Sequence, residues 1–160
     1  MNSFEPEFQN DTFTQKYTIS EIEDAIKNER ILRSRVSRCN YRNTLILDIG
    51  NEIFGEIDFV ELEYHKDNSL PRLAAATGRM GKIVSYVPTR IEKDENNKYK
   101  VICSRKKAQL LCLENYISKL RPGDIIDAQK IATDIYGVFV DIGCGIVALL
   151  KTRDISATHS

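Results

Sequence analysis

Two aromatic side chains in a glycine-rich apolar stretch are the strongest candidates for chemistry in this sequence. The stretch DIYGVFVDIGCGI, Asp134 to Ile146, contains Tyr136 and Phe139 among three glycines. Alternation along a strand places valines on one face and Phe139 with Asp141 on the other. If the valines face a core, the Phe139 ring is exposed, where it can stack on a flat aromatic ligand such as an unpaired base, and Gly137 leaves room for that ligand. The alternative is that both rings only cover the surface of the fold or pack on a neighbouring helix.

The sequence around these rings predicts the secondary structure that must position them, and this structure is mainly β. Short apolar runs separated by turn residues predict five strands, at 31–39, 44–49, 53–62, 82–92 and 99–104, with a longer connection around Pro71. This pattern is typical of a small closed antiparallel barrel. Apolar residues at spacings of three and four then predict a linker helix over 106–121, which Pro122 and Gly123 end. Three more strands are predicted at 123–132, 136–142 and 146–151.

The N-terminal region, 1–29, divides into an acidic leader and a short helix. Residues 1–17 show no periodicity, so we expect this leader to be flexible. Ser20 and Glu23 have the spacing of a capping box, and apolar residues recur at helical spacing as far as Asn28. Residues 1–29 hold seven acids and two bases, so the remainder of this uncharged chain carries a net charge of +5. A mildly basic body permits nucleic-acid binding without requiring it.

Composition excludes several classes of protein. With 42% hydrophobic and 29% charged residues, the chain has the composition of a globular protein. It lacks both an apolar run of the roughly 20 residues that span a membrane and the pattern of a signal peptide, so we expect a cytoplasmic protein. The four cysteines lack metal-ligand spacing, and we expect no metal and no cofactor. No catalytic motif is present, since Gly143-Cys144-Gly145 is too short for a phosphate loop, so we do not expect an enzyme.

The sequence also repeats itself. Leu47-Asp48-Ile49-Gly50 aligns with Val140-Asp141-Ile142-Gly143, and a strand is predicted on each side of both matches. The later copy has further motifs: Gly123-Asp124-Ile125-Ile126, Tyr136 to Gly143, and Gly145 followed by Ala148-Leu149-Leu150. Together these resemble the S-one domain, the RNA-binding OB-fold barrel repeated in the largest bacterial small-subunit ribosomal protein. The chain is most similar to short ribosomal-protein-like members in low-GC Gram-positive bacteria.

The resemblance implies two OB-fold domains of different completeness. Residues 30–105 resemble a divergent first domain, whose end at Val101 to Ala108 is similar to the last strand of the family. Residues 122–160 resemble a second domain that stops after its third strand. We expect it to be part of a longer protein; the alternative is a half-barrel that packs on the first copy or on another molecule. Lys130 stands where the family usually has an interior valine, so we expect that strand either to shift its register or to be loose.

The resemblance also implies a site for single-stranded RNA, with mRNA and the small ribosomal subunit as partners. Tyr136 and Phe139 fall on the two ring positions of the family, and Lys151 stands where it usually has a histidine. In the first copy, the last turn keeps Asp94 and either Lys98 or Lys100, where the family places an acid and a base near the RNA; the alternative is simply a solvated hairpin turn. The residues predicted to bind RNA are Tyr136, Phe139, Lys151, Arg153, Asp94, Lys98, Lys100 and Arg105.

The first copy supports a different function. Asn43 and Ile46 stand opposite the two rings, and Asp58 stands opposite Lys151, where its carboxylate repels phosphate. Tyr41, in the preceding loop, can replace a ring only in part. We expect Ile46 to be exposed, as on a protein-docking surface. The alternative function is therefore a protein-interaction or ribosome-docking module with little affinity for RNA.

Overall fold

The computed structural model describes residues 2–151 and contains a closed five-stranded barrel. Its strands are β1 (Leu32–Cys39), β2 (Leu45–Gly50), β3 (Ile53–Ile57), β4 (Ile83–Lys93) and β5 (Tyr99–Ser104). They follow the order β1-β2-β3-β5-β4, β1 pairs with β4, and β3 runs parallel to β5. This topology is compatible with the OB-fold and confirms the predicted barrel. β3 is shorter than predicted, because the chain leaves the sheet into the 3-10 helix η1 (Phe59–Glu61).

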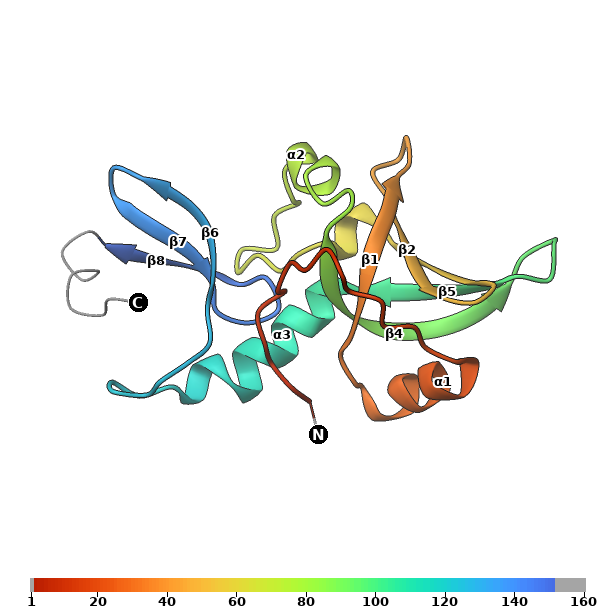
Figure 1. Cartoon of the computed structure of the whole chain (residues 1–160), viewed down its shortest axis with the longest axis horizontal. Coiled ribbons are helices and arrows are strands. Elements are labelled where there is room, and N and C mark those ends of the chain that lie inside the picture. Colours follow the sequence, from red (N-terminus) through yellow and green to blue (C-terminus); the bar gives the residue numbers. More distant parts are fainter. Residues whose placement is uncertain (1, 152–160) are drawn as a thin grey trace.

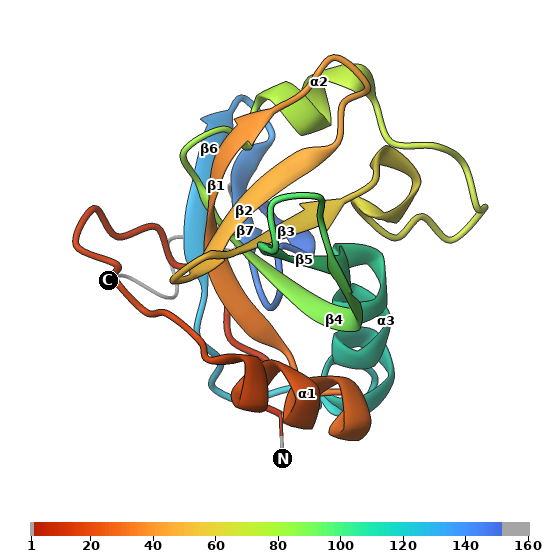
Figure 2. The same cartoon turned by 90° about the vertical axis from the view of Figure 1, so that its right-hand side faces the viewer.

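Two helices cover the barrel. α1 (Ile19–Asn28) lies at one end of it, and Ile22 joins the barrel core (Figure 2). Its capping box is formed by Thr18 and Glu21, two residues before the predicted one. The reason is that the Tyr17 amide donates to the Ile49 carbonyl at 2.9 Å, which fixes an extended chain up to the helix start. The short helix α2 (Leu73–Thr77) lies in the connection between β3 and β4.

Beyond the barrel, α3 (Arg105–Asn115) and the 3-10 helix η2 (Ile117–Lys119) form the predicted linker, and α3 lies between the barrel and a second sheet (Figure 1). This sheet contains β6 (Gln129–Asp134), β7 (Gly137–Asp141) and β8 (Val147–Lys151) in the order β6-β7-β8. In the described part of the chain it has three strands, as predicted, and both outer edges are open. β6 begins later than predicted. The pairing of β6 with β7 is irregular between Lys130 and Ala132, and Lys130 is exposed, as expected for a register shift that avoids a buried lysine.

The leader, residues 2–17, is not the flexible segment that its sequence predicts. It runs across the junction of the barrel and the second sheet before it enters α1 (Figure 1). Pro6 and Glu7 are buried, and the ring of Phe4 stacks on Tyr116 with centroids 6.1 Å apart. The leader also forms a backbone hydrogen bond with each copy of the repeat. The Cys144 amide donates to the Glu5 carbonyl at 2.9 Å, and the Tyr17 amide donates to the Ile49 carbonyl at 2.9 Å.

Within residues 2–151, no helix is both long and apolar enough to cross a membrane. The same residues contain no group of three or more His, Cys, Asp or Glu side chains that could hold a metal ion. The four cysteines are free thiols, three of them buried.

Candidate nucleic-acid interface

β7 and β8 bring Phe139 and Lys151 to one face of the second sheet. Phe139 pairs with Leu149, and Lys151 pairs with Gly137, two residues before Phe139. Directly paired residues share a face, and so do alternate residues of one strand. Phe139 and Lys151 are therefore diagonal neighbours, about 7–8 Å apart between Cα atoms. The phenyl ring is half-buried and the lysine is exposed, so a flat face and a cation lie side by side.

Tyr136 lies next to this pair, in the turn that joins β6 to β7. Its side chain is 67% exposed. The carboxylate of Asp134 holds the turn by accepting hydrogen bonds from the amides of Tyr136 at 2.7 Å and Gly137 at 3.3 Å. Gly137 has a φ of 150°, and a Cβ at this position would overlap the carbonyl oxygen of Leu150. The glycine therefore lets β8 approach β7 closely beside the exposed ring.

The predicted residues of the first copy lie at the other end of the molecule (Figure 1). Asp94 closes the β4–β5 turn, where its carboxylate accepts hydrogen bonds from the amides of Asn96 at 2.8 Å and Lys98 at 3.0 Å. The amino group of Lys100 lies 3.0 Å from the carboxylate of Glu56. These contacts are those of a hairpin turn with its own ion pair. The structure therefore does not bring Asp94, Lys98 and Lys100 together with the rings.

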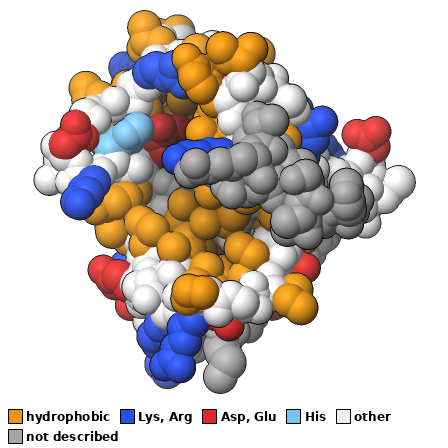
Figure 3. Space-filling model, turned by 90° about the vertical axis from the view of Figure 1, so that its left-hand side faces the viewer, with side chains coloured by type: hydrophobic (Ala, Val, Ile, Leu, Met, Phe, Trp, Pro, Cys, Tyr) orange, Lys and Arg blue, Asp and Glu red, His pale blue; other side chains and the backbone are white. Residues whose placement is uncertain are grey.

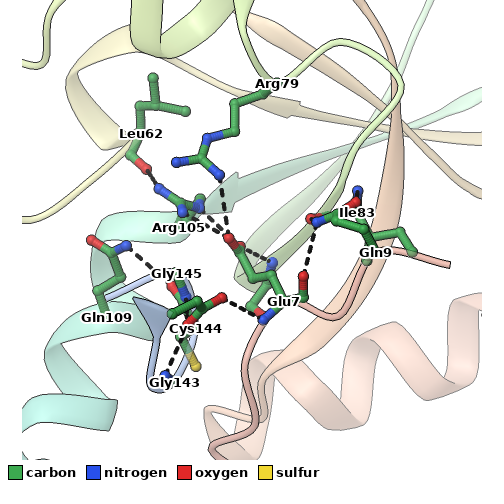
Figure 4. A network of polar contacts seen from close by, with 12 residues as sticks. Glu7, Gln9, Leu62, Arg79, Ile83, Arg105, Gln109, Gly143, Cys144 and Gly145 are labelled. Atoms are coloured by element: carbon green, nitrogen blue, oxygen red, sulfur yellow. Dashed lines mark hydrogen bonds and ion pairs between the residues drawn. The ribbon is translucent and has the colours of Figure 1, made fainter. Parts of the chain in front are cut away.

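Arg105 is not available to RNA, so that prediction is wrong. Its side chain is fully buried at the start of α3. Its guanidinium donates to both carboxylate oxygens of Glu7, at 2.7 and 2.9 Å, and to the Leu62 carbonyl at 3.0 Å (Figure 4). The leader thus uses the donors that were expected to meet phosphate. Arg153 lies outside the described residues.

The buried carboxylate of Glu7 is the centre of a polar network that joins three parts of the fold (Figure 4). It accepts a hydrogen bond from the Ser85 amide of β4 at 2.6 Å, and the guanidinium of Arg79 lies 3.5 Å away. Burial is the largest single effect and opposes ionisation of Glu7, but the charge and hydrogen bonds of Arg105, with Arg79 and the Ser85 amide, together outweigh it and hold the pKa of Glu7 below its usual value. Glu7 is therefore a carboxylate that ties the leader to the barrel and to α3.

The same network reaches the second sheet through Asp141. This side chain was expected on the exposed face with Phe139, but the leader covers it, and it is 4% exposed. Its carboxylate accepts hydrogen bonds from the amides of Glu7 at 2.7 Å, Gly143 at 2.9 Å and Gly145 at 3.0 Å. Burial raises the pKa of Asp141 above its usual value. The Asp141 carboxylate is therefore covered, whereas the part of the face around Phe139 and Lys151 is open to a ligand.

Two cations of β1 also bind the leader. Arg33 pairs with Glu5 at 2.8 Å, and Arg35 donates to the Asn10 carbonyl at 2.7 Å. Sequence reasoning missed this role of the leader. The one local signal is the alternation of Phe4, Pro6 and Phe8 with polar residues, which is typical of an extended segment with two different faces.

The matching surface of the barrel differs from the expected docking surface. Ile46 is 8% exposed, so the prediction of an exposed isoleucine is wrong. It lies on β2, where its partners on the adjacent strands are Arg38 and Glu56. Tyr41, in the β1–β2 loop, is exposed, with the guanidinium of Arg42 over its ring at 5.3 Å from the centroid.

Exposed apolar side chains are instead frequent in the second unit. Figure 3 shows hydrophobic side chains gathered on the face at this end of the molecule. Large apolar residues exposed between the linker and the end of β8 are Ile125, Ile131, Ile135, Tyr136, Val147, Leu149 and Leu150. The three-stranded sheet thus leaves apolar surface that a closed barrel would bury.

No family model matches this sequence, and no curated protein is significantly similar to it. The likeness to the S-one domain therefore rests on the quoted motifs alone. The barrel topology is compatible with that likeness but does not identify the family.

Proposed function

We propose that this protein binds single-stranded RNA through β7 and β8 and acts in translation as a ribosomal-protein-like factor of the S-one type. The observation that carries the proposal is that β7, β8 and the turn before β7 present the exposed Tyr136 ring, the Phe139 ring and the exposed side chain of Lys151 in one region of the second sheet. β7 and β8 are the second and third strands of their unit, and the corresponding strands of OB-folds bind oligonucleotides. mRNA is the expected ligand, and the proposal assigns no catalytic residue and no cofactor.

The cluster contains the two components that unstructured RNA requires. An aromatic ring offers its face to any base, and each stacked base contributes about 1–3 kcal/mol. The amino group of Lys151 meets a phosphate, and each such contact lowers the slope of log affinity against log salt by about 0.7 for a single strand. Binding should therefore be tolerant of sequence and should weaken as salt rises.

The test is a titration of a fluorescent single-stranded RNA of about 12 nucleotides, followed by anisotropy at several salt concentrations. Phe139→Ala and Tyr136→Ala should each weaken binding by roughly 5- to 150-fold, the equivalent of one stacked base. Tyr41→Ala removes a ring from the barrel that is even more exposed than Tyr136, and it is the control, expected to bind as the wild type does. The proposal is refuted if the affinity for RNA does not depend on salt. It is also refuted if Phe139→Ala and Tyr136→Ala both bind RNA as tightly as the wild type.

A protein-docking module is the second candidate function. The exposed apolar residues of the second unit favour it, because contiguous apolar surface commonly marks a protein interface. A tagged chain that recovers ribosomal proteins after nuclease treatment, and that shows no affinity for RNA in the titration, supports this candidate instead. Recovery that is lost with nuclease supports the RNA proposal.

A further inference from the structure

A cleft separates the second sheet from the α2 side of the barrel. It has a volume of about 500 Å³, and Glu7 of the leader, Arg79 and Lys82 of the segment after α2, and Lys130 of β6 lie on its walls. A neighbouring hollow of about 450 Å³ shares Arg79 and extends to Arg72. The leader and two otherwise separate units therefore enclose one elongated depression.

The acids in this depression are already paired. Glu7 is bound by Arg105, and the carboxylate of Glu63 lies 2.6 Å from the imidazole of His65. Asp141 accepts hydrogen bonds from three backbone amides, as described above. The charge of Glu7 is therefore offset by Arg105, and the oxygens of Asp141 and Glu63 are already engaged by hydrogen-bond partners within the protein.

The cations on the same walls have a different status. Arg72, Lys82 and Lys130 are exposed, and within residues 2–151 none of the three forms an ion pair. They come from opposite sides of the cleft, because Lys82 precedes β4 whereas Lys130 belongs to β6. An anion between them gains two cations without displacing an internal partner.

The cleft continues the face that carries Phe139. Asp141 and Val147 line it and are paired across β7 and β8, and Phe139 pairs with Leu149 two residues further along the same strands. Alternate residues share a face, so the cleft begins about 7 Å along β7 from the ring. An RNA strand that has one base stacked on Phe139 and continues toward Asp141 therefore carries its next phosphates into the cleft.

We propose that the cleft holds successive phosphates of the RNA strand whose base stacks on Phe139. This inference rests on the proposed function and adds a second contact region, built from both units, to the sheet surface. The ligand group is the sugar-phosphate backbone of an unpaired strand, held by Lys82 and Lys130 with Arg72 beyond them. Strands that are too short to extend from the ring into the cleft should bind without these cations.

The test compares a 2-nucleotide RNA, whose single phosphate lies beside the stacked base, with a 12-nucleotide single-stranded RNA, each titrated at several salt concentrations. The variant is Lys82→Gln/Lys130→Gln, and the matched control is Lys27→Gln/Lys98→Gln, which removes the same charge from exposed positions on α1 and the β4–β5 turn. Because all four side chains are exposed, the fold should be unaffected. With the longer RNA, the cleft variant should lower the salt slope by about 1.4, two phosphates at about 0.7 each. With the shorter RNA it should match the wild type.

The outcomes separate this inference from the function on which it rests. If Phe139→Ala weakens binding while the cleft variant keeps the wild-type slope with the longer RNA, the cleft inference is wrong and the RNA proposal stands. Equal losses in the cleft variant and in the control also overturn it, because they indicate only the total charge. If neither RNA binds the wild-type chain, both proposals fall.

Discussion

Removal of the charge of Glu7 should release the leader and destabilise the whole junction. The variant Glu7→Gln keeps the shape of the side chain but leaves the guanidinium of Arg105 without a counter-ion. Glu7 is 3% exposed and Arg105 is fully buried, so water cannot replace the lost partner. The amide group of the new glutamine would also direct donors toward the donors of Arg105 and of the Ser85 amide.

The magnitude follows from this geometry. Breaking a buried ion pair by removing one partner costs about 3–5 kcal/mol of unfolding free energy. For a chain of this size, each 1 kcal/mol shifts the melting temperature by about 2–4 °C, so the variant should melt roughly 6–20 °C lower. The matched control is Glu5→Gln, which removes a leader carboxylate whose side chain is 46% exposed beside Arg33. An exposed pair contributes about 0–1 kcal/mol, so the control should melt within a few degrees of the wild type.

The assay combines urea unfolding, followed by circular dichroism, with hydrogen exchange of the amides that contact the leader. The amides of Ser85 and Cys144, which donate to Glu7 and Glu5, should lose protection in Glu7→Gln and keep it in Glu5→Gln. Replacing both partners in Glu7→Leu/Arg105→Met should restore part of the loss, because the fully buried charge of Arg105 is then removed with that of Glu7, and only the partly exposed Arg79 loses its carboxylate. If Glu7→Gln loses no more stability than Glu5→Gln, the leader is not anchored by its buried pair.

Three further predictions concern other parts of the fold. Gly137→Ala should weaken the pairing of β7 with β8 by about 1–3 kcal/mol, because its Cβ overlaps the Leu150 carbonyl, and faster hydrogen exchange confined to the second sheet would show this. The stability gap between the wild type and Glu7→Gln should be complete above pH of about 4.3, the pKa of an unfolded glutamate. Since the folded pKa of Glu7 is lowered, that gap should shrink as pH falls through it, whereas a gap that is constant down to pH 2 contradicts the assignment. Lys98→Ala should leave RNA affinity unchanged, because the β4–β5 turn lies at the other end of the molecule from β7, and a loss would mean that RNA contacts the barrel.

The barrel could be predicted because its strands carry local signals. Alternating apolar residues and turns such as Gly50-Asn51 are read within a few residues, and all five strands occur near their predicted positions. The end of β3 at Ile57 was less predictable, since the apolar run continues through Phe59 and Val60 into a 3-10 helix. The sequence there is equally compatible with a strand.

The leader could not be predicted in the same way, because its structure depends on distant partners. Glu7 and Arg105 are 98 positions apart, and a buried glutamate has no local signature that distinguishes it from a solvated one. The burial of Asp141 has the same cause, since the segment that covers it comes from the other end of the chain. The wrong predictions of an available Arg105 and an exposed Asp141 thus have one origin. Both side chains are covered by the leader, whose position is not encoded locally in its sequence.

The bonds of the leader also constrain the order in which the protein can assemble during synthesis. Glu5 and Glu7 are synthesised more than 130 residues before their partners Cys144 and Asp141. The barrel can close once Ser104 has emerged, whereas the leader cannot complete its contacts until the second sheet has formed. The leader is therefore made before the barrel but is fixed after it, and a nascent chain remains open at this junction until synthesis has passed Gly145.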